Sequence, residues 1–222
     1  AGQMRMHHLI SLVALALFAM PAHAGPAFNF TKCPAFWEMQ SSRVKESFDL
    51  NKFAGSYYEL AFHDITQYPL CPKPSCIQSQ KVLDTSRTPT LVNDHWSLEC
   101  AGARFRPLLQ FNATEDRGYL KGFTKLFPGV IFPNTVVDFR YNTTSDAYDW
   151  VIELQCVEKL HHVWFVGINF YAKEPHSRDF MAEMLQASEE RGIAYYLNSH
   201  LGLYNVSQDN CHYDPPPQVF NQ

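Results

Sequence analysis

Six cysteines are the residues of this 222-residue chain best suited to covalent chemistry. No two of them form a C-x-x-C pair, and the spacing of cysteines and histidines matches no zinc-binding pattern. We therefore expect disulfides, an oxidising compartment and no metal site. The spacing alone leaves the pairing open. The cysteines are Cys33, Cys71, Cys76, Cys100, Cys156 and Cys211.

The sequence lacks the motifs of several common enzyme classes. It contains no G-x-S-x-G nucleophile motif and no glycine-rich phosphate loop. His161 and His162 are adjacent, so on a strand they would point to opposite faces and could not easily share a metal ion. A formal net charge of −4 argues against a nucleic-acid partner, because phosphate binding needs a basic face. We expect no required cofactor.

Residues 1–24 have the pattern of a secretory signal peptide. A basic start at Arg5 precedes an apolar run from Leu9 to Met20, and an A-x-A ending follows at Ala22 to Ala24. The run is shorter than the roughly 20 apolar residues that span a membrane, so cleavage is favoured over a retained anchor. Because the chain opens with Ala1, a bipartite leader into an organelle lumen, such as a thylakoid's, is the alternative. Four triplets would be glycosylation acceptors on the secretory route, at Asn29, Asn112, Asn142 and Asn205.

Beyond the leader, residues 25–47 are expected to form an irregular arm held by Cys33. Eight short β-type runs follow, separated by turn residues such as those at 86–89 and 115–118. Eight runs with short connections predict one up-and-down antiparallel barrel, because full closure removes exposed strand edges. The runs are Phe53 to Phe62, Cys76 to Leu83, Thr90 to Glu99, Arg104 to Phe111, Tyr119 to Leu126, Thr135 to Tyr141, Tyr148 to Glu158 and His161 to Ala172.

One later segment, from Pro175 to Arg191, has apolar residues at helical spacing and is followed by Gly192. It predicts an amphipathic helix on the outside of the barrel. A short strand at Ala194 to Leu197 should then return along the barrel before Cys211. The expected organisation is a leader at 1–24, an arm at 25–47, a barrel domain at 48–213 and a flexible tail at 214–222.

This order of elements, and six short motifs within it, resemble the lipocalin family and most of all its apolipoprotein D group. The motifs occur in order over nearly all of the chain after the leader. Lipocalins are all-β proteins, with an eight-stranded antiparallel barrel and one C-terminal α-helix packed outside. The motifs are Asn51 to Leu60 (similar to G-x-W followed by Y-E-L), Ser75 to Ser79, Thr144 to Tyr148, Leu160 to Phe165, Ala172 to Pro175 and Asp209 to Cys211.

The resemblance implies a closed barrel base and a set of disulfides. At the base, the family packs an arginine over a tryptophan, and this chain has Lys173 and Tyr57 at those positions, with Gly55 beside them. A lysine over a tyrosine is a weaker cation–π pair, so we expect a less rigid base. The implied disulfides are Cys33 with Cys156, Cys76 with Cys211, and Cys71 with Cys100.

Strand alternation from this base predicts which side chains face the barrel interior. The expected interior is aromatic with a few polar groups, which suits an apolar ligand held by one or two hydrogen bonds. A fatty acid, another lipid, a retinoid-like molecule, or a carotenoid or other pigment would fit. The alternative is that the aromatic rings simply fill the barrel. The expected ligand-binding residues are Glu59, Ala61, His63, Val137, Phe139, Tyr141, Trp150, Ile152, Leu154, Phe165, Asn169 and Tyr171.

Asp64 to Tyr68, followed by Cys71 and Cys76, also resembles the violaxanthin de-epoxidase-type lipocalins of plastids, which open carotenoid epoxides with acidic residues. The main alternative to a carrier is therefore a lumenal enzyme that uses Asp64 and Glu59. General acid catalysis needs a carboxyl whose pKa is raised by apolar surroundings. Otherwise Asp64 is an ordinary carboxylate at the barrel rim.

Two further alternatives remain at this point. Some lipocalins carry haem, and His63 is the inward-facing candidate for a haem ligand. A lipocalin could also act as a scaffold at a membrane surface or in a membrane complex, held by an uncleaved leader. The expected location is secreted or lumenal.

Overall fold

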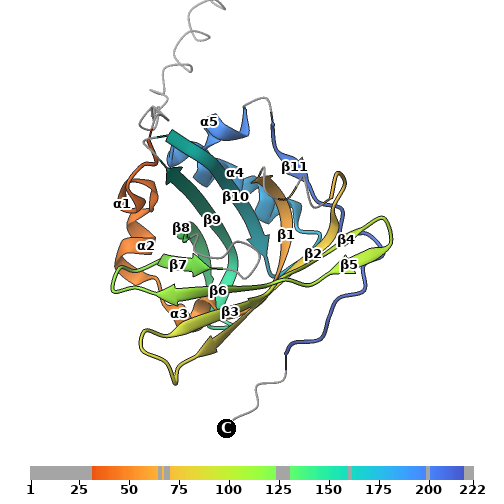
Figure 1. The fold of residues 1–222 in the computed structure, drawn as a ribbon, viewed down its shortest axis with the longest axis horizontal. Coiled ribbons are helices and arrows are strands. Elements are labelled where there is room, and N and C mark those ends of the chain that lie inside the picture. Colours follow the sequence, from red (N-terminus) through yellow and green to blue (C-terminus); the bar gives the residue numbers. More distant parts are fainter. Residues whose placement is uncertain are drawn as a thin grey trace, which may run out of the picture.

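The structure, a computed structural model, describes residues 32–64, 67, 71–123, 131–159, 162–198 and 201–217. The expected leader and the side chain of Phe165 lie outside this part. Its main body is a closed antiparallel β-barrel, with helices on the outside (Figure 1). The fold class predicted from the sequence is therefore confirmed.

Eight strands form the barrel, and β1 pairs with both β2 and β10 to close it. The predicted runs at 90–99 and 104–111 are each divided in two, at Trp96 and at Pro107. Their outer halves, β4 and β5, extend the sheet as a hairpin beside β2. The strands are β1 (Gly55–Asp64), β2 (Ser75–Asp84), β3 (Leu91–His95), β4 (Ser97–Cys100), β5 (Ala103–Phe105), β6 (Leu108–Ala113), β7 (Tyr119–Phe123), β8 (Phe132–Asn142), β9 (Ala147–Lys159) and β10 (His162–Ala172).

The arm before the barrel contains three short helices rather than an irregular chain. They are α1 (Phe36–Met39), α2 (Ser42–Ser47) and α3 (Leu50–Phe53). Ser41 and Asp49 cap α2 and α3 with their side-chain oxygens, a pattern that the sequence analysis did not use. Met39 and Val44 are fully buried against the barrel, so apolar contacts hold the arm in place.

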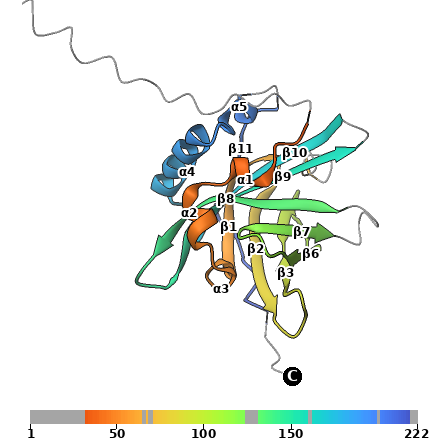
Figure 2. The same cartoon turned by 90° about the vertical axis from the view of Figure 1, so that its left-hand side faces the viewer.

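Helix α4 (Arg178–Glu190) lies outside the barrel against β9 and β10, as predicted (Figure 2). Ser177 caps its start by accepting from the Phe180 N–H. The predicted strand at 194–197 is wrong, because this segment is a helix, α5 (Ala194–Leu197). Ile193 and Tyr196, three residues apart, share one buried face, and this spacing fits a helical turn better than a strand. The returning strand, β11 (Tyr204–Asn205), comes later and pairs with β1.

The chain after β11 fills a gap where β1 and β2 diverge. Val206 N–H donates to the Leu60 carbonyl, and the Gln208 side chain donates to the carbonyls of both Glu59 and Ile77. Gln208 is 4% exposed, so one amide bridges the two strands where their direct pairing has ended. The tail therefore completes the barrel wall.

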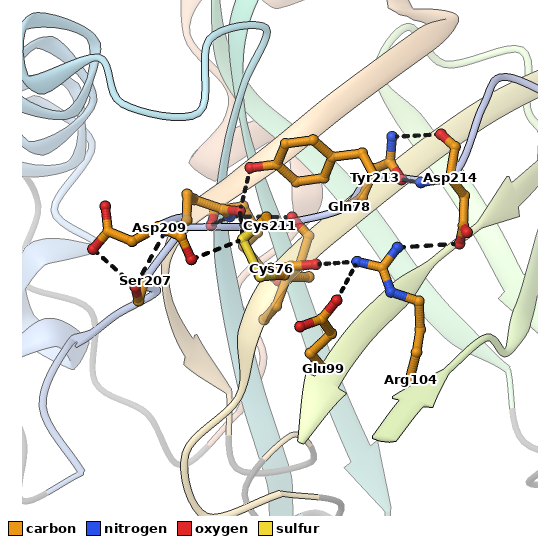
Figure 3. The surroundings of a disulfide bond; sticks show 12 residues. Cys76, Gln78, Glu99, Arg104, Ser207, Asp209, Cys211, Tyr213 and Asp214 are labelled. Atoms are coloured by element: carbon orange, nitrogen blue, oxygen red, sulfur yellow. Dashed lines mark hydrogen bonds and ion pairs between the residues drawn. A yellow bond between two sulfur atoms is a disulfide. The ribbon is translucent and has the colours of Figure 1, made fainter. Parts of the chain in front are cut away.

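The segment that follows β11 is held to the barrel by the Cys76–Cys211 disulfide and by Asp214 (Figure 3). Asp214 forms ion pairs with Arg104 and Arg106, and its carbonyl accepts hydrogen bonds from Gln78 and Gln80. The chain is thus fixed to the barrel as far as Asp214. The three disulfides are Cys33–Cys156, Cys71–Cys100 and Cys76–Cys211, the pairing that the resemblance implies.

Candidate functional site

The closed end of the barrel has the cation–π pair expected from the resemblance. The Lys173 ammonium lies 3.7 Å from the centre of the Tyr57 ring. Gly55 has a φ of +110°, a conformation that favours glycine. A Cβ there would lie 2.8 Å from the Lys173 ammonium, so the absence of a side chain also leaves room for the lysine. Burial, and after it the nearby Lys81 charge, lower the pKa of Lys173 to about 8. Phe53 of α3 packs beside Tyr57 and helps to seal the base.

The bulge in β1 reverses the predicted orientation of Ala61 and His63. Strand β1 has one extra residue between Glu59 and Ala61, opposite β10, so alternation is broken there. Glu59 faces inward as predicted, but Ala61 belongs to the apolar cluster under α4 and α5. His63 also lies outside, where its Nδ1 is 2.7 Å from the Gly202 carbonyl oxygen. The predicted inward positions of Ala61 and His63 are wrong, and so is the haem-ligand position inside the barrel.

The apolar face of β9 and one residue of β8 also lie on the outer side. Asp149 is an extra residue opposite β8, which reverses alternation between Tyr148 and Trp150. The Trp150 indole donates to Glu183 of α4 at 2.9 Å. Apolar residues line this outer face because helices cover it, so hydrophobicity alone misidentified the inner face. The corrected residues, all packed with Met39 of α1 or Met184 of α4, are Val137, Trp150, Ile152 and Leu154.

Four of the predicted ligand-binding residues face inward, namely Glu59, Phe139, Asn169 and Tyr171. Phe139 stacks on Tyr148 near the base, with ring centres 4.1 Å apart. Tyr141 does not line the interior, because it is 38% exposed and stacks with Lys52 at the closed end.

The apolar inner wall is made largely of residues that the sequence analysis did not select. The Trp96 indole hydrogen-bonds the Tyr171 side chain, which places it inside the barrel. Leu109 of β6 is partly buried and packs against both inner clusters. Several of these strands carry polar residues on both faces, so the alternation of apolar and polar residues does not show which of their side chains face inward. The wall residues are Phe62, Ile77, Val92, Trp96, Leu98, Leu109, Phe111, Leu120, Val136 and Val151.

A buried ion triad crosses the lower part of the barrel and was not predicted. The Lys81 ammonium of β2 lies 2.9 Å from a carboxylate oxygen of Asp94 and 2.9 Å from one of Glu153. None of the three side chains is more than 3% exposed. Burial by itself lowers the pKa of Lys81, but Asp94 and Glu153 together raise it above that of an exposed lysine. The triad forms a charged floor above the aromatic base.

Side chains of neighbouring strands also donate hydrogen bonds to the two carboxylates of this floor. Ser79 Oγ donates to Asp94 at 2.8 Å, and Asn134 Nδ2 donates to Glu153 at 2.7 Å. The Lys81 ammonium also lies 5.0 Å from the ring centres of Phe53 and Tyr171. Each charge is therefore enclosed by a partner or a ring.

A second group of polar side chains lies on the inner wall of β1 and β10. Glu59 is fully buried and accepts from Gln67 Nε2 at 3.2 Å. With its amide nitrogen turned toward Glu59, Asn169 donates to the same carboxyl at 3.0 Å. Burial raises the pKa of Glu59 well above its usual range, and the Gln67 hydrogen bond only partly opposes this. Burial therefore favours the neutral form of the Glu59 carboxyl.

Asp64, proposed as an alternative acid, is also buried and faces inward. It is 4% exposed and lies beside Gly167, where a Cβ would come within 2.8 Å of the carboxylate. Gly167 thus makes the space that Asp64 occupies. The interpretation of Asp64 as an ordinary carboxylate at the barrel rim is therefore wrong, because its side chain is buried.

Four buried polar atoms of the inner wall have no hydrogen-bond partner among the described residues. They are Tyr57 Oη, Gln67 Oε1, Asn134 Oδ1 and Glu153 Oε1, and the last of these is in ion contact with Lys81. Buried polar groups in a fully packed core are normally paired. The first three therefore mark places where a bound molecule or water can complete the hydrogen bonding.

The described residues contain neither a metal-binding cluster nor a membrane-spanning helix. No group of three or more histidine, cysteine, aspartate or glutamate side chains is arranged to hold a metal ion. Within the same residues, no helix has the length and apolar character needed to cross a membrane.

The chain is similar to one curated protein and to solved structures with the same fold. It is 25% identical to apolipoprotein D of Cavia porcellus over 174 residues, which cover 75% of this chain and 82% of that protein. It superimposes on a crystal structure of apocrustacyanin C1 with a TM-score of 0.53 and 9% identity, over 72% of this chain and 79% of that one. No protein-family profile matches the chain.

Proposed function

The chain is a lipocalin in its fold and its sequence resemblance, and from that premise we propose that it binds a small hydrophobic molecule inside its barrel. The base is sealed by α3 and by the Lys173–Tyr57 pair, so a ligand would enter from the other end. The walls toward that end carry apolar side chains, including Phe62, Trp96 and Leu98. A closed apolar cup of this kind suits a ligand with an apolar body.

The observation that carries this proposal is a set of neutral buried polar atoms on the inner wall that have no hydrogen-bond partner among the described residues. Tyr57 Oη and Asn134 Oδ1 are buried without partners in the described residues, although the surrounding residues are tightly packed. A ligand with an apolar body and one polar group would bury its body against the wall and pair such an atom. Lipids, retinoid-like molecules and carotenoids share this chemistry, and carrying or shielding one of them is the proposed role.

Leu109 and Leu108 offer a matched test of this proposal, because they are adjacent residues on opposite faces of β6. Leu109 packs against the inner clusters, whereas Leu108 is 42% exposed. We expect wild-type protein to bind N-phenylnaphthylamine, an uncharged apolar fluorophore. Leu109→Trp should weaken binding at least about tenfold, or about 1.4 kcal/mol, because the indole fills the cup. Leu108→Trp should bind as the wild type does.

Trp96 supplies a second readout from inside the barrel. It is 5% exposed on the inner wall, whereas Trp37 is 56% exposed on the arm. A fluorophore in the cup should quench Trp96 emission, and Trp96→Phe should remove most of that quenching. Trp37→Phe is the control. A fluorophore that binds equally well to Leu109→Trp would place the site outside the barrel and refute the proposal.

A second candidate function, acid catalysis on a carotenoid epoxide, is favoured by Glu59. A buried neutral carboxyl facing an apolar interior has the pKa that a general acid needs. Xanthophyll conversion by wild type, Glu59→Gln and Asp64→Asn, with an ascorbate-type reductant supplied to take up the epoxide oxygen as water, tests this function. A loss of roughly 100-fold in one variant, with unchanged fluorophore binding, would support the enzyme. If wild-type protein takes up the xanthophyll but does not convert it, the enzymatic function is refuted and the carrier function stands.

The proposed location is extracellular or within the secretory pathway. Three disulfides, with every described cysteine paired, fit an oxidising compartment. Association with a membrane surface, where a lipid ligand could be loaded, is an additional proposal. Flotation of the protein with lipid vesicles would test it.

A further inference from the structure

The charges inside the barrel limit which ligands it can hold. The floor has one ammonium, on Lys81, for the two carboxylates of Asp94 and Glu153, so its net charge is negative. Asp64 adds a third buried carboxyl on the inner wall. Within the described strands, the other basic side chain inside the barrel is Lys173, and it lies over the Tyr57 ring at the base. Among the described residues, a ligand carboxylate in the cup would therefore meet the net negative charge of the floor and no cation that is not already engaged.

A cationic ligand is disfavoured for a different reason. Asp94 already accepts from Ser79 and Lys81, and Glu153 accepts from Asn134 and forms an ion pair with Lys81. These oxygens are enclosed by their donors, so an ammonium would lose its hydration without gaining a free carboxylate. Burial of an unpaired charge is strongly unfavourable.

Apart from Glu153 Oε1, which is in ion contact with Lys81, the inner-wall atoms left without hydrogen-bond partners are neutral, and the best defined of them is an acceptor. Asn134 donates its amide hydrogen to Glu153, which fixes Oδ1 as the unpaired atom. An acceptor of this kind needs an uncharged donor, such as a hydroxyl. Glu59 lies buried on the same inner wall, and in the neutral form that burial favours it can donate to or accept from such a hydroxyl.

From this arrangement we propose that the barrel selects uncharged lipophiles that carry a hydroxyl group, and that it discriminates against fatty-acid carboxylates. This inference rests on the proposed function and names its ligand class. The Lys81–Asp94–Glu153 floor is the element that excludes the anion, and Asn134 is the acceptor that favours the alcohol.

The test compares decanol, decanoate and decylamine as competitors for N-phenylnaphthylamine at about pH 7, where the acid and the amine are charged. We expect decanol to compete at least about tenfold better than either, or about 1.4 kcal/mol. The methyl ether of decanol, an uncharged analogue without a donor, should compete less well than decanol. Equal or tighter binding of decanoate or decylamine, or equal binding of the ether, would overturn the inference.

Glu153→Gln identifies the floor as the source of the selectivity. The substitution keeps an oxygen that can accept from Lys81 and leaves Lys81 and Asp94 as a neutral pair. The preference for decanol over decanoate should then fall several-fold. Glu158→Gln, on an exposed residue of the same strand, should leave the preference unchanged. An unchanged preference in Glu153→Gln would show that the floor does not set the selectivity.

These outcomes separate the inference from the proposed function. If the fluorophore fails to bind wild-type protein, or binds without any effect of Leu109→Trp, the barrel is not the binding site and both proposals fail. If Leu109→Trp blocks the fluorophore but decanoate competes as well as decanol, the barrel binds hydrophobic molecules and the inference alone is refuted.

Discussion

Replacing Lys81 with methionine tests the buried floor most directly. The substitution keeps an unbranched chain between the rings of Phe53 and Tyr171 but removes the charge shared by Asp94 and Glu153. At 2.9 Å, each ion contact corresponds to a Coulomb attraction of about 6 kcal/mol with an effective dielectric constant of about 20. The desolvation of Lys81, which the variant avoids, offsets much of this.

The expected net effect of Lys81→Met is a loss of about 3 to 5 kcal/mol in the free energy of unfolding, the usual result of stranding a buried charge. Water cannot replace the ammonium, because neither carboxylate side chain is more than 3% exposed. A domain of ordinary stability, about 5 to 15 kcal/mol, would survive this change but would be visibly weakened.

Urea unfolding followed by circular dichroism, with the disulfides intact, measures this loss. With a slope of about 1 to 3 kcal/mol per M, the midpoint should fall by more than about 1 M. Lys52→Met is the control, because Lys52 pairs with the largely exposed Asp146 and its loss should leave the midpoint close to that of wild type. A shift in Lys81→Met as small as in the control would refute the buried-triad argument.

Three other changes have definite expected outcomes. Burial raises the pKa of Glu59, so above about pH 4.3 unfolding releases its proton and the free energy of unfolding should fall as pH rises. Glu59→Gln should make this dependence on pH shallower in urea titrations at several pH values. Tyr57→Phe removes a buried hydroxyl that has no partner in the described residues and keeps the ring under Lys173, so thermal unfolding should show no loss or a gain of about 1 kcal/mol. Removing Cys76–Cys211, with a separation of 135 residues, should cost about 1 kcal/mol more than removing Cys71–Cys100, with a separation of 29, because the longer loop is the more costly to close. Equal slopes, a clear loss in Tyr57→Phe, or the reverse order of the disulfides would contradict these expectations.

The sequence predicted where the strands lie better than which way their side chains point. Strand positions follow from short β-type runs between turn residues, and a bulge changes them little. Orientation depends on unbroken alternation, and one extra residue at Leu60 sends Ala61 and His63 outside. On β9 the outer face is apolar because α4 covers it, so Trp150 resembled a cavity residue.

The ion triad could not be inferred from the sequence for a related reason. Lys81, Asp94 and Glu153 come from three strands, and β2 and β9 are not neighbours in the barrel. A lysine in a strand with polar residues on both faces is usually assigned to solvent. Asp94 lies directly opposite Lys81 on the neighbouring strand β3, but only closure of the barrel brings the Lys81 ammonium to Glu153, so the triad depends on the three-dimensional arrangement rather than on spacing.

The charged floor is easier to explain by selectivity than by stability. Replacing a buried ion group with well-packed apolar residues is often neutral or stabilising, so an interior selected for stability alone would not need Lys81, Asp94 and Glu153. The base below the floor is already closed by aromatic packing and by the Lys173–Tyr57 pair. What the floor adds is a fixed negative potential, with its oxygens shielded by donors, at the bottom of an apolar cup. Such a potential weakens the binding of an anion while leaving the burial of an uncharged apolar chain unaffected. The stability lost in Lys81→Met and the selectivity lost in Glu153→Gln therefore report on two different consequences of the same three side chains.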